Sequence, residues 1–366
     1  MSRGRKSANS SAALRKWMAE ADKPSALSNT HFLIHPPNMA KYNEKTSIHE
    51  LVSDYAPKIK GKTILTTGVT PNSLGHVFVE AIAAASPRLL ILAGRSAAKL
   101  EQTTQSIVAA HPGTQTRSLV VDLSSLASVR RAAEEVNSWA DVPNIDVVVN
   151  NAGVMGVDFA LTRDGFETQF AASHVGHFLL TNSIMEKILA SDSPRIVNVS
   201  SDGHRLGPLR WADPHFSNGE TYHKWVAYGQ AKTSNMLFAI SLAEKLGKLG
   251  LQAYSLHPGV IMSTGLGNHL NQSEEGDFKL LRETDRLQGN SEGWADFDVV
   301  PSDVGTATHA FAAFDDTISE RNGAYLLKCR VADPYVDTVK PWATSPIEAD
   351  KLWKLSEELV GQKFGY

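Results

Sequence analysis

The sequence has few of the features that would place a protein outside a reducing, aqueous compartment. Cys329 is the single cysteine in 366 residues, which excludes an intramolecular disulfide. No apolar run approaches the roughly 18 residues that a membrane-spanning helix requires. The formal net charge of −3 favours neither nucleic acid nor an anionic membrane as a partner. We therefore expect a cytoplasmic protein with no membrane span and no nucleic-acid partner.

The first 60 residues differ in composition from the rest of the chain. Met1–Lys16 contains five basic residues and several serines but no acid. This composition favours a disordered tail, and a mitochondrial transit peptide is the alternative. Within residues 46–60, apolar side chains recur at helical spacing, which predicts a helix that packs on the following domain. We expect residues 1–60 to form a partly disordered extension and residues 61–366 to form one domain.

Short β-branched runs alternate with amphipathic segments through most of the chain. This alternation predicts an α/β fold with a doubly wound, Rossmann-like parallel sheet. The expected strands cover residues 62–66, 89–93, 118–121, 146–149, 195–199, 251–256 and 324–327. The main expected helices cover residues 97–110, 125–139, 166–189 and 227–249.

Tyr228 and Lys232 carry the strongest chemical signal. At a spacing of four residues they share one face of the expected helix. An ammonium beside a phenol favours the phenolate and lowers its pKa, so the pair can move a proton to or from an alcohol or ketone oxygen. The alternative is a solvated helix face with no chemical role.

Three further motifs fall at predicted strand ends, where ligands bind in open α/β sheets. Ser200 and Ser201 follow the strand 195–199, and the small residues of Asn151-Ala152-Gly153 follow another. The segment 67–75 joins the first strand to a helix through a glycine-containing turn, which suits a pyrophosphate.

In this order, these motifs resemble the short-chain dehydrogenase/reductase family, and its retinol-dehydrogenase-like branch in particular. The resemblance covers roughly residues 62–330 and includes His257-Pro258-Gly259-Val260 and Gly176-His177-Phe178-Leu179-Leu180-Thr181. It implies hydride transfer with Ser201, Tyr228 and Lys232 as catalytic residues. Ser173 stands where the family has an asparagine that holds a relay water, and we expect it to keep that role.

The resemblance also implies a nicotinamide dinucleotide site. Its expected residues are Gly68, Thr70, Asn72, Ser73, Leu74, Gly75, Arg95, Ser96, Asp122, Leu123, Asn151, Ala152, Gly153, Tyr228, Lys232, Pro258, Gly259 and Val260. In the turn, Asn72 and Ser73 occupy positions where glycine is common, and Ser73 is expected to donate to a phosphate. We interpret His174 and His177 as packing residues and predict no metal site.

The cofactor is predicted to be NADP(H). The second strand ends Ala93-Gly94-Arg95-Ser96, without the acid that accepts from the ribose hydroxyl of NAD. Arg95 can instead form charge-assisted bonds to a 2′-phosphate, and Ser96 adds a hydroxyl. Alternatively, Arg95 is simply exposed and Ser96 caps a helix.

Residues 202–226 and 261–300 interrupt the alternation of strands and helices. Long loops near strand ends are often functional, so we expect the second segment to cover the substrate, although both could be surface loops. Their apolar and aromatic residues suggest an apolar or aromatic carbonyl or alcohol as substrate. A non-catalytic dinucleotide-binding regulator and an epimerase or dehydratase are the alternatives, and a homo-oligomer is left open.

Overall fold

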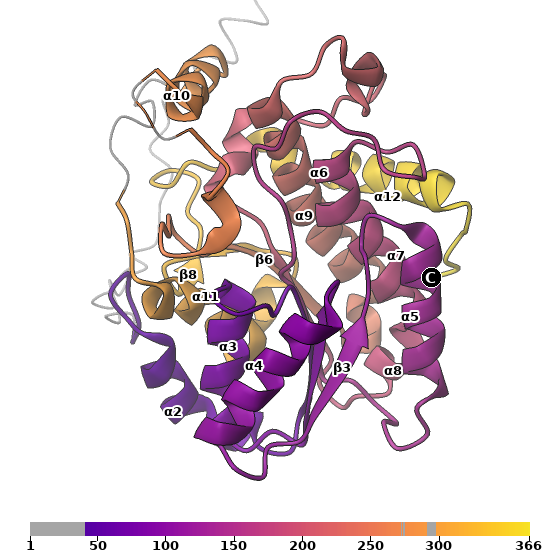
Figure 1. Ribbon diagram of the computed structural model, residues 1–366, viewed down its shortest axis with the longest axis vertical. Coiled ribbons are helices and arrows are strands. Elements are labelled where there is room, and N and C mark those ends of the chain that lie inside the picture. The colour runs from indigo at the N-terminus through magenta and orange to yellow at the C-terminus, as the bar shows by residue number, and fades with distance from the viewer. Residues whose placement is uncertain (1–40, 272, 274, 291–297) are drawn as a thin grey trace, which may run out of the picture. The chain divides into compact units, whose positions relative to one another are not determined.

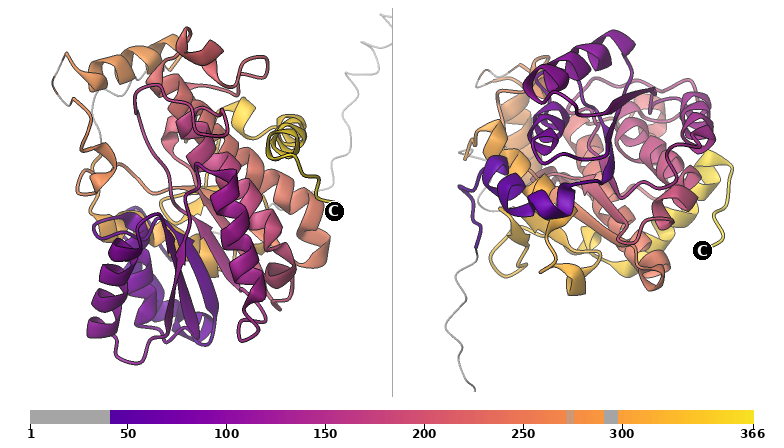
Figure 2. Two further views of the ribbon diagram at one scale, coloured as in Figure 1. Left: turned by 45° about the vertical axis from the view of Figure 1, so that its right-hand side comes forward. Right: turned by 90° about the horizontal axis from the view of Figure 1, so that it is seen from below.

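A mostly parallel sheet with helices on both faces forms the centre of the protein (Figures 1 and 2). The computed structural model describes residues 41–271, 273, 275–290 and 298–366, and Lys41–Tyr366 falls into one compact unit. The strand order is β3-β2-β1-β4-β5-β6-β7-β8, with β8 antiparallel to β7. The strands are β1 (Thr63–Thr67), β2 (Leu89–Gly94), β3 (Thr116–Val120), β4 (Val147–Asn150), β5 (Arg195–Val199), β6 (Gln252–His257), β7 (Tyr325–Leu327) and β8 (Arg330–Val331).

Successive strand residues face opposite sides of the sheet and supply two separate cores. Ile64 belongs to the core under one set of helices, whereas Leu65 belongs to the core under the other. Leu90 and Ile91 divide in the same way. Burial on both faces explains why the strand sequences are nearly continuous apolar runs. The doubly wound, Rossmann-like fold predicted from the sequence is confirmed.

Two groups of helices cover the two faces. One core includes α2 (Ile48–Ile59), α3 (Leu74–Ala83), α4 (Ala97–Ala110) and α11 (Ser302–Phe314). The other includes α5 (Leu126–Ser138), α7 (Gly176–Ser183), α8 (Met185–Leu189), α9 (Lys224–Leu246) and α12 (Pro346–Val360). Helix α10 (Asp277–Leu287) stands apart, beyond the carboxyl ends of the strands (Figure 1).

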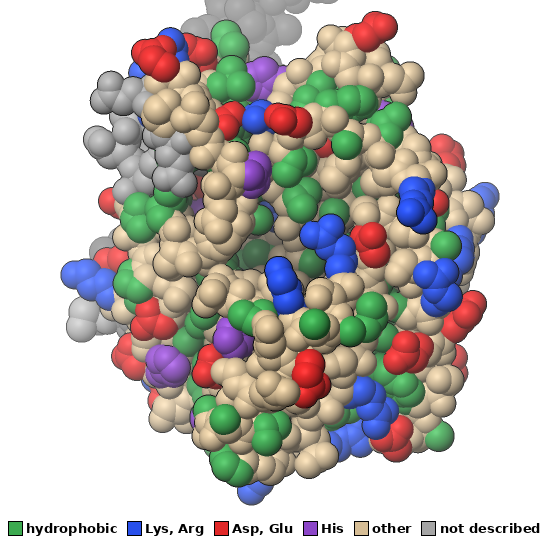
Figure 3. Space-filling model, viewed as in Figure 1, with side chains coloured by type: hydrophobic (Ala, Val, Ile, Leu, Met, Phe, Trp, Pro, Cys, Tyr) green, Lys and Arg blue, Asp and Glu red, His purple; other side chains and the backbone are tan. Residues whose placement is uncertain are grey.

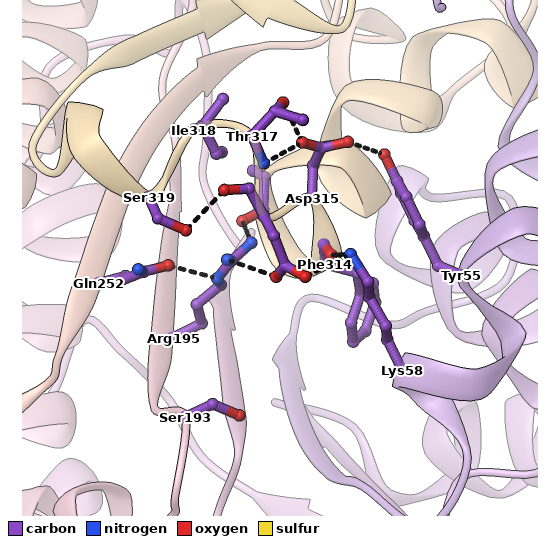
Figure 4. A network of polar contacts seen from close by, with 12 residues as sticks. Tyr55, Lys58, Ser193, Arg195, Gln252, Phe314, Asp315, Thr317, Ile318 and Ser319 are labelled. Atoms are coloured by element: carbon purple, nitrogen blue, oxygen red, sulfur yellow. Dashed lines mark hydrogen bonds and ion pairs between the residues drawn. The ribbon is translucent and has the colours of Figure 1, made fainter.

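Helix α2 packs on the α/β domain, as its apolar spacing predicted. A capping box between Ser47 and Glu50 starts the helix, and Tyr55 is one of its buried residues. Tyr55 donates a hydrogen bond to Asp315, just after α11. In Figure 4 the same region includes the buried Arg195, which donates to Gln252 Oε1 at 3.0 Å. The Tyr55–Asp315 bond attaches α2 to the end of α11, whereas the Arg195–Gln252 bond joins β5 to β6.

Several element boundaries differ from the sequence prediction. The expected single helix 166–189 is divided into α6 (Thr168–Phe170), the π-helical turn η1 (Ala171–Val175), α7 and α8. Such a turn contains an extra residue, which hydrophobic periodicity does not reveal. Helix α9 begins three residues earlier than expected, at Lys224, and the short β8 was not predicted. A strand of two residues is too short to show an alternating pattern.

The described helices do not include one that is long and apolar enough to cross a membrane. The predicted tail or transit peptide at Met1–Lys16 lies outside the described residues. The domain division at residue 60 stays a prediction.

Candidate active site

Strand β5 and helix α9 are joined at the point where the strand ends. Ser200 Oγ donates to the carbonyl oxygen of Lys232 at 2.7 Å, and Lys232 Nζ donates to the carbonyl oxygen of Val199 at 3.0 Å. Both side chains are buried. These bonds place the ammonium at the carboxyl edge of the sheet, where the sequence predicted a site.

Tyr228 lies one helical turn before Lys232, with Lys232 Nζ 5.7 Å from the centre of its ring. The 3₁₀ turn η2 (Asp202–Leu206) packs against that ring, because a Cβ on Gly203 would lie 2.4 Å from Tyr228 Cε1. Ser201 precedes this turn and its Oγ accepts from Gly203 N at 3.0 Å. The structure therefore brings Ser201, Tyr228 and Lys232 together.

Burial dominates the titration of this pair. It raises the pKa of Tyr228 to about 12, while a hydrogen bond with Ser201 acts in the opposite direction. Burial also lowers the pKa of Lys232 to about 8. The sequence argument expected the ammonium to lower the pKa of the phenol. In the structure the pKa is raised instead, because a buried phenolate is poorly solvated and the hydrogen bond with Ser201 offsets this only in part.

Ser173 lies in the π-helical turn η1 and faces the same site. Its hydroxyl is buried and has no hydrogen-bond partner within the described part of the chain. A Cβ on Gly153 would lie 3.2 Å from Ser173 Oγ and 3.5 Å from Lys232 Nζ, so both polar atoms approach the same glycine. A buried hydroxyl beside an ammonium suits a bound water.

His174 and His177 are held by hydrogen bonds inside the fold. The Nε2 atom of His174 lies 2.8 Å from Ser356 Oγ, and that of His177 lies 2.8 Å from Thr67 Oγ1. Burial lowers the pKa of His174 to about 3 and that of His177 to about 4. Both rings are therefore neutral packing groups, as the sequence interpretation held.

Hydrogen bonds among its own residues stabilise the glycine turn between β1 and α3. Gly68 and Asn72 have φ angles of +74° and +63°, which glycine and asparagine tolerate. Ser73 Oγ donates to Gly68 O at 2.8 Å and caps α3 by accepting from His76 N. The expected Ser73 donor to a phosphate is thus occupied within the turn.

Close packing also requires glycine at both Gly68 and Gly75. A Cβ on Gly75 would lie 2.6 Å from Gly68 O, and one on Gly68 would lie 2.9 Å from Ala152 Cα. Asn151 Nδ2 donates to Thr67 O at 2.8 Å. The turn that begins α3, with Thr70 and Leu74 on it, therefore lies against the 151–153 segment after β4.

The residues expected at the adenosine end of a cofactor occupy the ends of β2 and β3. Arg95 is exposed, and Ser96 Oγ caps α4 by accepting from Lys99 N at 3.4 Å. The Asp122 carboxylate accepts from Ser124 within its own loop. Leu123 lies against the start of α7, since a Cβ on Gly176 would lie 2.2 Å from the Leu123 carbonyl oxygen.

The segment after β6 lies beside the residues that return from the second long insertion. Val300 N donates to Val260 O at 2.9 Å, and Val260 forms a parallel bridge with Val299. Gly259 has a φ of +90°, and a Cβ there would lie 2.7 Å from Val300 Cγ2. Pro258, Gly259 and Val260 therefore connect the sheet edge to this insertion.

An apolar cluster covers Tyr228. This cluster consists of Leu206, Trp225, Leu270 and Leu281 packed with Tyr228. The Trp225 and Tyr228 rings meet edge to face, with 6.2 Å between their centroids. Leu270 and Leu281 belong to the insertion 261–300, so the part of that insertion which the structure describes contributes to the cover. Tyr228 is 5% exposed as a result.

The residues present fit a nicotinamide dinucleotide. The glycine turn leads directly into α3, where Ser73 Oγ caps His76 N and the N–H groups of Leu74 and Gly75 have no acceptor within the helix, an arrangement that suits a phosphate. Figure 3 shows a hollow near the middle of this face with Lys or Arg side chains beside it. No metal-binding group of three His, Cys, Asp or Glu residues occurs within the described ranges.

Two positioning residues escaped the sequence argument. Gly203 touches the Tyr228 ring, and Asn235 Nδ2 donates to the Ser173 carbonyl oxygen at 2.7 Å. Asn235 could have been found as a polar residue on the buried helix face one turn after Lys232. Gly203 lies in a loop, where no periodic pattern indicates contacts.

Known proteins resemble this chain over most of its length. The short chain dehydrogenase family model matches residues 62–213. Mouse retinol dehydrogenase 14 is 32% identical over 310 residues, covering 82% of this chain and 86% of that protein. The short-chain dehydrogenase/reductase prx1 of Penicillium rubens is 33% identical over 318 residues, covering 84% and 87%. A solved structure of an uncharacterized protein from Mycobacterium paratuberculosis has a TM-score of 0.63 at 27% identity, covering 85% of this chain and 98% of that one.

Proposed function

The chain belongs to the short-chain dehydrogenase/reductase family, in its retinol-dehydrogenase-like branch, and from this premise we propose that it is an NADP(H)-dependent oxidoreductase. Its substrate is a carbonyl compound or alcohol of an apolar or aromatic small molecule. The convergence of Ser201, Tyr228 and Lys232 under an apolar cover carries this proposal. The cofactor supplies or accepts the hydride when it is bound.

Each polar group of the site has a distinct part in proton transfer. Tyr228 gives its proton to the carbonyl oxygen in reduction and takes one from the alcohol in oxidation. Ser201 donates to the substrate oxygen and orients it. Lys232 holds its charge beside the phenol and contacts the nicotinamide ribose. Ser173 binds the water through which the lysine exchanges protons with solvent.

The pKa of Tyr228, raised to about 12, favours the protonated acid at neutral pH. Reduction needs this form, so the site is suited to carbonyl reduction near pH 7. Oxidation needs the phenolate, and its rate should rise with pH across the alkaline range. Comparing the two directions from pH 6 to 10 tests this assignment.

Tyr228→Phe tests the proton-transfer role directly. The variant keeps the ring against Gly203 and removes the phenolic proton. Reduction of an aldehyde panel with NADPH should fall by at least about 10²-fold, the contribution typical of a general acid. Cofactor binding, followed by fluorescence titration, should persist. Near wild-type turnover in this variant would overturn the assignment.

Arg95→Ala tests the cofactor preference. Arg95 is exposed at the end of β2, where it can reach a 2′-phosphate, and losing one charged hydrogen bond costs about 1.5–3 kcal/mol. NADPH affinity should therefore fall roughly ten-fold or more, with little change for NADH. Lys248→Ala, which removes an exposed cation before β6, is the control. Equal affinities of the unmutated protein for NADPH and NADH would contradict the preference.

A non-catalytic, dinucleotide-binding regulator is the second candidate. The observation that favours it is the glycine turn, in which Ser73 Oγ donates to Gly68 O instead of facing a phosphate. Such a protein would bind NADPH in the fluorescence titration yet oxidise none of it with any carbonyl of the panel. An epimerase or dehydratase would convert substrate without a net change in cofactor absorbance at 340 nm.

A further inference from the structure

Arg205 and Asp285 form a buried ion pair between the 3₁₀ turn η2 and helix α10. Arg205 Nε lies 2.7 Å from Asp285 Oδ1, and Arg205 Nη2 lies 2.8 Å from Asp285 Oδ2. The pair is therefore bidentate. Both side chains are almost completely buried. Asn290 Nδ2 donates to Asp285 Oδ1 at 2.7 Å as well. Arg205 Nη1 also lies 3.4 Å from Asp202 Oδ2 within η2, so Asp285 is the carboxylate that connects the guanidinium to a different element. Loss of Arg205 would leave the Asp285 carboxylate buried without its cation.

The two charges belong to elements that both touch Tyr228. Arg205 is part of η2, whose Gly203 packs against the Tyr228 ring. Asp285 is part of α10, whose Leu281 packs in the apolar cluster over the same ring. The ion pair therefore ties the cover of the site to the turn that positions the phenol.

Helix α10 has other attachments besides this ion pair, and Phe278 and Leu280 pack against the apolar cluster. Its buried residues are Leu281, Thr284 and Asp285. At its first turn, Asp277 Oδ1 lies 3.0 Å from Lys224 Nζ, and the Asp277 carbonyl oxygen accepts from Trp225 Nε1 at 2.9 Å. In the last turn, Thr284 Oγ1 lies 3.3 Å from His223 Nε2, and the Arg205–Asp285 ion pair supplies the charged attachment.

We propose that Arg205 and Asp285 are positioning residues that hold α10 over Tyr228 and thereby set the affinity for an apolar substrate. The pair acts through Leu281 and the apolar cluster that packs on the Tyr228 ring. The kinetic part of this inference rests on the proposed function, whereas the attachment of α10 does not.

Amide hydrogen exchange of the substrate-free protein tests the attachment. Asp285→Asn removes the ion pair that connects α10 to η2, while Arg205 keeps Asp202 within η2. Amides of residues 277–287 should therefore exchange at least about ten times faster than in the unmutated protein. Lys279→Ala is the matched control, because it breaks an exposed ion pair between the same helix and Glu275, which lies just before it. Unchanged exchange in Asp285→Asn would overturn the proposal, whatever the activity.

Steady-state kinetics test the effect on substrate. With nonanal and saturating NADPH, Asp285→Asn should raise KM roughly ten-fold while kcat changes less than about three-fold, and NADPH affinity should stay constant. Replacing the pair by Arg205→Met with Asp285→Leu should restore both KM and slow exchange, since apolar residues of similar volume can substitute for a buried pair. Parallel losses of kcat, NADPH affinity and melting temperature would show a merely structural role.

Arg205→Lys replaces Asp285→Asn if that variant does not fold, because it keeps the charge and loses the two-pronged geometry. It should give the same direction of change with a smaller size. If the unmutated protein reduces no carbonyl compound, the proposed function fails, and the exchange experiment still decides the attachment of α10.

Discussion

At the scale of single residues, the candidate site contains buried polar atoms that have no hydrogen-bond partner among the described residues. Ser173 Oγ and Asn235 Oδ1 are both buried without a hydrogen-bond partner in the described part of the chain. The Ser173 carbonyl oxygen already accepts from Asn235 Nδ2, and it lies 3.1 Å from His177 Nδ1. A buried hydroxyl without a partner costs free energy unless a water meets it. These atoms therefore favour an ordered water near Lys232.

Replacing Ser173 tests this water. Ser173→Ala removes the free hydroxyl without adding volume, so turnover should fall modestly, by roughly three- to ten-fold, if the water relays protons. The loss should be larger for oxidation, which requires proton removal. Ser173→Asn, which restores the residue that the family has here, should be tolerated. Identical pH–rate profiles for Ser173→Ala and the unmutated protein would place Ser173 outside the relay.

At the scale of elements, the catalytic geometry depends on how tightly η2 packs on α9. The two elements approach closely at Gly203 and at Gly229, where a Cβ would lie 2.6 Å from Gly207 N. This close approach holds the Tyr228 ring in one place. Because protein interiors are closely packed, a small displacement of η2 should also displace the Tyr228 ring.

Gly203→Ala should impair catalysis without unfolding the protein. The added methyl would meet the Tyr228 ring, and overpacking of this kind typically costs about 1–3 kcal/mol. We expect a displaced phenol, with kcat reduced at least about ten-fold and a melting temperature lower by several degrees. Gly365→Ala is the control, since a Cβ there meets no atom within 4 Å. Unchanged kcat in Gly203→Ala would show that the ring does not need this contact.

At the scale of the whole molecule, buried histidines link stability to pH. Burial lowers the pKa of His174 and His309 to about 3, and that of His177 and His204 to about 4. In the unfolded chain each would titrate near its ordinary value of about 6.5. Between these values the unfolded chain binds more protons than the folded protein.

The free energy of unfolding should therefore fall as the pH falls from about 6.5 towards 4. Each group contributes at most about 1.4 kcal/mol per pH unit in this window, so a loss of several kcal/mol is expected by pH 5. Urea denaturation at pH 7, 6 and 5, followed by circular dichroism, measures it. His309→Leu removes one of the four groups and should reduce the slope. A stability that is constant from pH 7 to 5 would contradict the burial of neutral imidazoles.

Sequence predictions were accurate where a feature depends on residues that are close together in the chain and produces a periodic pattern, and failed where there is no such pattern or where the feature depends on residues that are far apart in the chain. The strands were found because burial on both faces requires apolar runs, and helix α2 was found from its spacing. The division of the expected helix 166–189 was missed, because a π turn leaves no apolar signature. The pKa of Tyr228 was expected to fall and is raised instead, because desolvation depends on all neighbours of the ring.

The sequence by itself determined the doubly wound fold, the family and the order of the candidate site residues, because periodicity and short motifs are local properties of the chain. Only the tertiary structure decided that Gly203 packs against Tyr228, that Ser73 Oγ is bonded within its own turn, and that Arg205 meets Asp285. The Arg205–Asp285 pair joins residues 80 positions apart. Such pairs form only when strands and helices pack, since close packing sets which distant side chains meet.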